Sequence, residues 1–281
     1  MSCAECHAAR QAAVDLFASR GVRTQPGIQP RHHRLEIASS AVRNGPLRQS
    51  LVLAAICAAS ALLAGPAYRM ELLSLRAAFQ MLQWATFGAA GAALVALQAW
   101  GLLAWAKAPR GRRMAALALV LGLAAAGPPL YLYAHAKGLP PIHDISTDTV
   151  DPPAFVAVLP LRQGARNAVD VAPDTLAQQK RGYPDIAPLR LNLPPAEAFA
   201  RAERAVRAMG WQIVAVTPEA LRIEATDTTL FFGFKDDIVI RVRPSENGSV
   251  VDMRSLSRVG TSDVGVNAKR IRAFLGRLSA G

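Results

Sequence analysis

The residues best suited to chemistry lie near the C-terminal end of the chain, where arginines and hydroxyls cluster around a glycine. They are Arg254, Ser257, Arg258, Thr261 and Ser262. We expect a strand to end and a helix to begin here, so that guanidinium groups and helix N-terminal amides lie close together. Guanidinium groups pair with carboxylates and phosphates through two parallel hydrogen bonds. The turn is therefore a candidate anion site, with a lipid headgroup or a phosphate as the ligand.

The acidic residues around this turn support a second interpretation. They would satisfy Arg254 and Arg258 within the protein, and Asp263 would cap the following helix. This structural network comprises Asp236, Asp237, Gly260, Asp263, Asn267 and Arg270. The substitution Arg258→Ala separates the two interpretations, because a network predicts lost stability whereas a ligand site predicts lost binding with stability kept.

Catalysis is a weaker prediction for the C-terminal half. It contains no cysteine, and the only histidines in it or at its membrane edge are His143 and His135, so general bases and nucleophiles are scarce. Asp236 and Asp237 are adjacent in a predicted strand and should point to opposite faces. We therefore predict no enzyme and no cofactor. The alternative is an envelope hydrolase or transferase that uses these two aspartates and the arginine turn.

Metal ligation has two candidate sets, neither of which we expect to be occupied. Cys3, Cys6 and His7 match the C-x-x-C-H pattern of haem attachment, or could bind zinc with His32 or His33. Residues 1–46 are instead expected to be a disordered cytoplasmic tail, where haem is not attached. The second set could bind a divalent cation but reads more simply as a polar linker: His143, Asp144, Asp148 and Asp151.

Three apolar stretches precede the arginine turn. Residues 51–68, 77–106 and 114–134 contain no Asp, Glu, Lys or Arg, and each is long enough to cross a bilayer, which takes about 20 apolar residues. We predict three transmembrane helices within residues 47–137. Small residues at four-residue spacing on the second predict close packing between these helices, or between copies of the chain in a homo-oligomer.

The net charge of +12 is a topology signal. Residues 1–137 hold 14 basic and 4 acidic residues, whereas residues 138–281 hold 18 and 16. Arginines and lysines flank the predicted spans on the N-terminal tail and the second loop, which places both in the cytoplasm. We therefore predict a multi-pass protein of the bacterial inner membrane with a periplasmic C-terminal domain. A nucleic-acid partner is not expected, because the excess charge belongs to the apolar half.

The C-terminal half divides into two parts. Residues 138–188 are rich in proline and are predicted to be a linker. Residues 189–281 predict an α+β domain, in the order strand, helix, four strands, helix, with an antiparallel sheet and both helices on one face. The third of those four strands is expected over 230–243. Strand alternation then leaves a mixed-charge face that we expect to be solvated, with Arg222, Glu224, Arg241, Asp252 and Arg254 on it.

Three motifs in this domain resemble the Domain of Unknown Function 1499 family. They are Phe234-Lys235-Asp236-Asp237, the segment from Met253 to Gly260, and Ser262-Asp263-Val264-Gly265-Val266-Asn267-Ala268-Lys269-Arg270-Ile271. The resemblance covers residues 142–279 and implies membrane-attached relatives but no activity. The expected function is thus a membrane protein whose outer domain binds an envelope protein or an anionic ligand such as a lipid.

Overall fold

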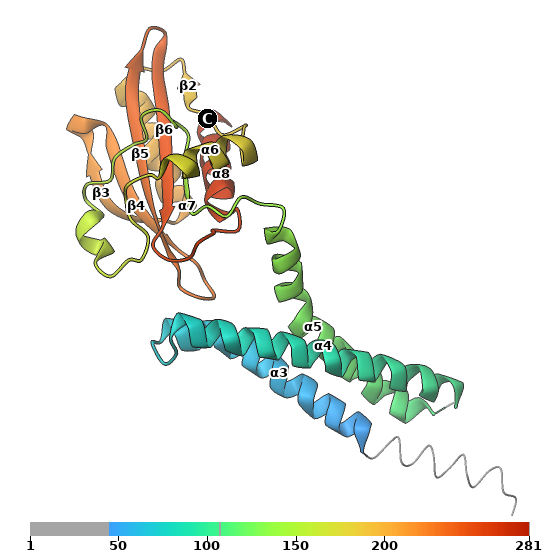
Figure 1. Cartoon of the computed structure of the whole chain (residues 1–281). Coiled ribbons are helices and arrows are strands. Elements are labelled where there is room, and N and C mark those ends of the chain that lie inside the picture. The colour runs from blue at the N-terminus through green and yellow to red at the C-terminus, as the bar shows by residue number, and fades with distance from the viewer. Residues whose placement is uncertain (1–44, 107, 281) are drawn as a thin grey trace, which may run out of the picture.

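Three long helices open the part of the chain that the structure describes. In this computed structural model, residues 45–106 and 108–280 are described, and they begin with α3 (Pro46–Arg69), α4 (Leu75–Trp105) and α5 (Pro109–Ala136). Each is long and apolar enough to cross a membrane, so the three predicted apolar helices are present and are membrane-capable (Figure 1). The predicted tail and the C-x-x-C-H motif lie outside the described residues.

Small side chains hold the three helices together. Ala85 and Ala89 of α4 pack against Cys57 and Ala61 of α3 and against Ala125 of α5. The interfaces leave no room for larger residues, since a side chain at Gly122 of α5 would lie 2.8 Å from a carbonyl oxygen of α4. Because lipid tails are as apolar as the helices, such close contact is what drives packing within a bilayer.

The last turns of α5 lead from the helices into the C-terminal domain. Figure 1 shows α5 running beside α4 and then turning away toward the sheet. Pro128 and Pro129 lie inside this helix. A proline removes a backbone hydrogen bond and its ring clashes with the preceding turn, which accounts for a bend in this region.

The C-terminal domain is built on one antiparallel sheet, which confirms the predicted α+β class. Its strands follow one another in the order β1-β6-β5-β4-β3, and β2 pairs with a separate part of β6. The strands are β1 (Asp144–Ser146), β2 (Leu189–Leu191), β3 (Gln212–Thr217), β4 (Arg222–Thr228), β5 (Lys235–Ser245) and β6 (Gly248–Ser257). Long β5 and β6 form the centre of the domain.

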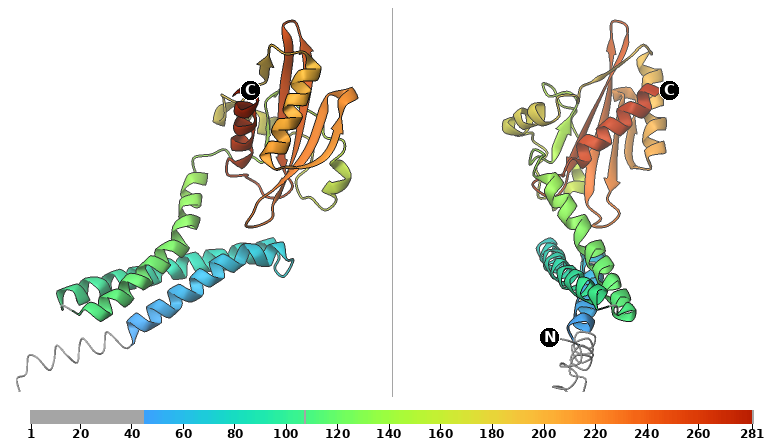
Figure 2. Two further views of the ribbon diagram at one scale, coloured as in Figure 1. Left: turned by 180° about the vertical axis from the view of Figure 1, so that it is seen from behind. Right: turned by 90° about the vertical axis from the view of Figure 1, so that its right-hand side faces the viewer.

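Helices α7 (Pro195–Met209) and α8 (Val266–Ala280) cover one face of this sheet, as the sequence predicted. Figure 2 shows both helices on the same side when the sheet is seen edge-on. The core between them holds Ile238 and Ile240 of β5, Met253 of β6 and Phe274 of α8. Gly210 ends α7 with a positive φ of 75°, a conformation that glycine adopts without steric cost.

The predicted linker over 138–188 is wrong in part, because much of this segment belongs to the domain. It contains β1, the short helix η1 (Leu159–Arg162) and α6 (Pro173–Gly182). Residues 144–170, which we call the covering segment, begin as the edge strand β1 and then lie against the face of the sheet opposite α7 and α8. Prolines disfavour long helices, but they do not prevent a chain from packing as irregular structure.

The third of the four predicted strands begins later than expected. Residues 229–234 do not extend β5 but form a separate turn between β4 and β5, the β4–β5 loop. Thr229 closes it, since its hydroxyl accepts a hydrogen bond from the amide of Phe234 at 2.8 Å. Gly233, with a φ of 69°, provides the reversal that the turn requires.

Candidate functional site

The sheet face that we expected to be solvated is buried beneath the covering segment. Glu224, Asp237, Asp252 and Arg254 are each no more than 4% exposed. The aromatic ring of Phe155 and the side chain of Val158 pack there against Val239 and Leu256. Strand alternation correctly predicted which side chains share this face. It could not predict that a distant part of the chain covers it.

Glu224 fixes the covering segment through its backbone. The carboxylate accepts hydrogen bonds from the amides of Val156, Ala157 and Val158, at 3.0–3.1 Å. Consecutive backbone amides that point at the same group form an anion-binding site known as a nest. Here the bound anion is the Glu224 carboxylate of the protein itself. The contact ties residues 156–158 to β4.

Asp237 lies at the centre of a second ion-pair cluster. Arg258 binds its carboxylate with two hydrogen bonds of 2.8 and 2.9 Å, and Arg162 of η1 binds it at 2.5 Å. Thr226 adds a hydroxyl donor at 2.8 Å. Asp237 is fully buried, so two guanidinium groups share one enclosed carboxylate.

Arg254 is paired in the same way on a neighbouring part of the face. Its guanidinium binds both carboxylate oxygens of Asp144, at 2.7 and 3.0 Å, and donates to the carbonyl of Val169. The same group lies 5.0 Å from the centre of the Phe155 ring, in a cation–π contact. Arg254 thus connects β6 to both ends of the covering segment.

The predicted anion site is therefore built differently from what its residue types suggested. Arg254 and Arg258 each face a carboxylate of this protein, and Ser257 accepts a hydrogen bond from Asn267. Thr261 contacts His143 through its carbonyl, and the Ser262 hydroxyl accepts from the amide of Val264. The fold brings the two arginines to one sheet face, but their guanidinium groups bind carboxylates of this protein instead of a ligand.

The remaining network residues lie on the opposite side of the sheet, under α8. Arg270 binds Asp236 at 2.7 Å and Asp227 at 2.8 Å, and also donates to Asn267 and to the Ser255 hydroxyl. Asp236 and Asp237 thus point to opposite faces, as strand alternation predicts. Their carboxylates bind different arginines and do not form a pair for acid–base chemistry.

Asp263 caps α8 as predicted. Its two carboxylate oxygens accept hydrogen bonds from the amides of Gly265 and Asn267, at 3.0 and 2.6 Å. Burial raises the pKa of Asp263, and the nearby Asp236 charge adds to this, against the opposing effect of the two amides. Gly260, with a φ of 94°, forms the turn before it.

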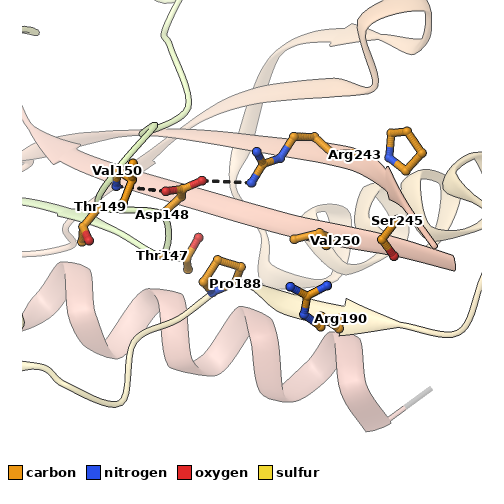
Figure 3. Close-up of a pocket in the computed structure, with 10 residues that line it drawn as sticks. Thr147, Asp148, Thr149, Val150, Pro188, Arg190, Arg243, Ser245 and Val250 are labelled. Atoms are coloured by element: carbon orange, nitrogen blue, oxygen red, sulfur yellow. Dashed lines mark hydrogen bonds and ion pairs between the residues drawn. The ribbon is translucent and has the colours of Figure 1, made fainter. Parts of the chain in front are cut away.

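An open groove of about 540 Å³ lies at the other end of β6, and the sequence did not predict it. Residues 147–150, β2 and the hairpin between β5 and β6 form its walls. Figure 3 shows two arginine side chains along it, Arg243 from β5 and Arg190 from β2, on either side of Val250. The groove has a volume in the range of small-ligand sites.

The two arginines differ in their partners. Arg243 is 40% exposed and binds Asp148 and the buried Asp252, both at 2.9 Å. Arg190 is exposed and forms no ion pair with any residue in the described ranges. It therefore brings an uncompensated positive charge to the groove.

Asp148 is the acidic residue of the groove lining. Burial alone would raise its pKa, but hydrogen bonds from the amides of Asp151 and Val150 and from Arg243 together lower the pKa below its usual value. A carboxylate with a lowered pKa is a weak base. Asp148 and Asp151 also bind Arg241. Among the described residues, no group of His, Cys, Asp or Glu is arranged to hold a metal ion.

Two functional residues escaped sequence reasoning for different reasons. Arg162 lay in the predicted linker, with no periodic pattern to place it. Arg190 lies between Leu189 and Leu191 in a short strand, and nothing in that alternation indicates a groove. The walls come from residues some 100 positions apart, and only the folded chain brings them together.

Comparisons with known proteins agree with the boundaries of this domain. Residues 144–278 match the family described as "Protein of unknown function (DUF1499)". A comparison with curated proteins found no match. The matched region begins at β1, so the family domain includes the covering segment. The three membrane-capable helices precede it.

Proposed function

We propose that this chain, a DUF1499 domain that follows three membrane-spanning helices, is an inner-membrane protein whose domain binds an acidic partner on the periplasmic side. The observation that carries the proposal is the groove with Arg190 unpaired beside the half-exposed Arg243. Guanidinium groups with free donors bind carboxylates in preference to neutral groups.

The position of the groove favours a partner from the aqueous side. Figure 1 shows β2 and the hairpin between β5 and β6 at the end of the domain far from α3 and α4. A headgroup of the membrane that holds the helices would meet the opposite end of the domain. We therefore favour an acidic segment of an envelope protein as the ligand, with a soluble phosphate compound as the alternative that the experiment separates.

The lining of the groove supports binding rather than catalysis. It holds no histidine, cysteine or lysine among the described residues, and its carboxylate is bound to Arg243. The alternative, a hydrolase or transferase acting through Asp236 and Asp237, gains no support from carboxylates that lie on opposite faces. A non-enzymatic role is the simpler proposal.

Arg190→Ala is expected to weaken binding of an acidic peptide about tenfold, because one charged hydrogen-bond donor contributes about 1.5 kcal/mol or more. Titration calorimetry of the full chain in nanodiscs, with a glutamate-rich peptide and with inorganic phosphate as separate probes, measures this. Arg204→Ala is the matched control, since Arg204 is an exposed arginine on α7, across the sheet. Equal loss in both variants, or no binding of either probe, would contradict the proposal.

The orientation rests on the distribution of basic residues and has its own test. We expect an alkaline-phosphatase fusion placed after Gly138 to be active, because the enzyme folds only outside the cytoplasm, and one placed after Ala108 to be inactive. The second site lies in the loop beside Arg110 and Arg112. Activity in the reverse pattern would overturn a periplasmic domain.

A further inference from the structure

The β4–β5 loop gathers an unusual amount of apolar surface at one end of the domain. Three of the nine phenylalanines of the chain lie in it, Phe231, Phe232 and Phe234, together with Leu230. Leu230 is 89% exposed and Phe231 is 39% exposed. The other large apolar side chains of this domain are mostly buried. Exposing Leu230 and Phe231 to water at a loop tip is unfavourable in free energy, because apolar surface is more stable away from water.

Two of these rings attach the loop to the membrane-capable helices. Phe232 and Phe234 stack on each other, with centroids 4.9 Å apart, and Phe232 stacks on Phe79 of α4 at 5.3 Å. Phe234 contacts Tyr68 of α3 at 5.7 Å. The loop therefore sits where α3 ends and α4 begins.

Contacts with α3 fix the positions of the other two apolar residues of the loop, Leu230 and Phe231. Arg69, the last residue of α3, donates to the carbonyl of Leu230 at 3.1 Å. Phe231 packs against Gly65, where an added side-chain carbon would lie 2.6 Å from its ring. The loop is also closed internally, since the amide of Gly233 donates to the carbonyl of Thr229 at 2.9 Å. Leu230 and Phe231 are thus held in place rather than free to fold inward.

The apolar surface of the loop continues that of the helices. Leu62 and Leu63 of α3 and Leu72 beyond its end are each more than half exposed, as side chains that face lipid are. Leu230 and Phe231 lie against the same end of α3. Basic side chains flank the loop on both sides, Arg69 and Lys235, and both suit anionic headgroups.

We propose that the β4–β5 loop is a second membrane anchor, in which Leu230 and the exposed edge of Phe231 insert into the bilayer that α3, α4 and α5 span. The occupant of this surface is lipid, because the loop is continuous with the lipid-facing surface of α3. Phe232 and Phe234 join the loop to the helices, and Arg69 and Lys235 meet the headgroups. The domain is thereby held with its groove directed away from the membrane.

A spin label at position 230 tests this proposal in the full chain. The variant Leu230→Cys, with the three native cysteines replaced as C3S, C6S and C57A, is labelled and placed in vesicles of phosphatidylcholine and phosphatidylglycerol. We expect the label to be relaxed more by oxygen than by a water-soluble nickel chelate, at a depth on the order of 5–10 Å. The label barely perturbs the fold, because the Leu230 side chain is 89% exposed and only the backbone carbonyl of this residue is bound.

Asn247→Cys, in the hairpin at the far end of the sheet, is the matched control and should show the opposite preference. A label at 230 that favours the nickel chelate as strongly as the one at 247 overturns the proposal, because the loop then lies in water. A label shielded from both reagents also overturns it, because a protein surface then covers the loop. Neither outcome bears on binding at the groove, which Arg190→Ala tests separately.

Discussion

Replacing Asp237 by alanine is expected to lower the free energy of unfolding of the C-terminal domain by about 3–5 kcal/mol. The change leaves Arg162 and Arg258 facing each other without the carboxylate that both bind. The buried guanidinium group of Arg162 and the partly buried one of Arg258 lose their counter-charge, and the desolvation that the carboxylate offset becomes a net cost. Pulse proteolysis of the full chain in detergent, across a urea series, measures the stability of the domain directly.

The exposed pair between Asp185 and Arg272 provides the control for this prediction. Both side chains are about half exposed, and Asp185→Ala should change the free energy of unfolding by less than about 1 kcal/mol. A loss below about 1 kcal/mol for Asp237→Ala as well would contradict a structural role. The interpretation of Arg258 as part of an anion site has its own test, which is the binding of anionic probes by the Arg258→Ala variant. A ligand site predicts that this variant loses affinity and keeps its stability, whereas a structural network predicts that it loses stability.

Arg270→Ala should be as damaging, for the same reason on the other side of the sheet. Within the described residues, Arg270 is the cation that Asp227 and Asp236 share, and it is only 6% exposed. Its removal also takes away one of the two donors to the side-chain oxygen of Asn267 and leaves only the Ser255 hydroxyl. We expect a loss of about 3–5 kcal/mol, measured by the same proteolysis series. Hydrogen exchange of the α8 amides should accelerate, because Arg270 joins this helix to the sheet through hydrogen bonds to Asp227, Asp236 and Ser255.

Two further variants keep the Arg270 prediction falsifiable. Lys269→Ala changes the exposed neighbour on the same helix and should leave stability unchanged within about 0.5 kcal/mol. Adding Asp236→Asn to Arg270→Ala should recover part of the loss, since it removes an unpaired charge, so the two changes should be non-additive. Strict additivity would show that the two side chains do not act as a pair.

The predicted elements that held are those with a strong local signal. The three apolar stretches predicted three spanning helices because crossing a bilayer requires long runs of apolar residues, and chance rarely produces them. Helix α7 is the first of the two predicted helices, and its local signals are strong, since Pro195 begins it, Gly210 ends it and apolar side chains recur at helical spacing. Strand alternation placed Ile238 and Ile240 in the core and Asp237 on the opposite face.

The elements that failed depend on contacts between distant parts of the chain. The covering segment has no periodicity, and its strand β1 is three residues long, so its position is set by Arg254, Glu224 and Asp237 rather than by its own sequence. The β4–β5 loop is as apolar as a strand, and its contacts with α3 and α4, together with the turn that Thr229 and Gly233 form, explain why β5 starts after it.

The sequence by itself thus determined the three membrane-capable helices, the order of strands and helices within residues 189–281 and the opposite sides of the sheet on which Asp236 and Asp237 lie, because these follow from hydrophobic periodicity and charge along the chain. The tertiary structure decided what the charges do. Arginines that read as an anion site are paired internally, whereas Arg190, in a stretch without a motif, is left free at a groove. A guanidinium group has the same chemistry in both places. What distinguishes a structural ion pair from an open binding site is whether the fold brings a carboxylate to it, from 21 residues away for Arg258 and from 110 residues away for Arg254.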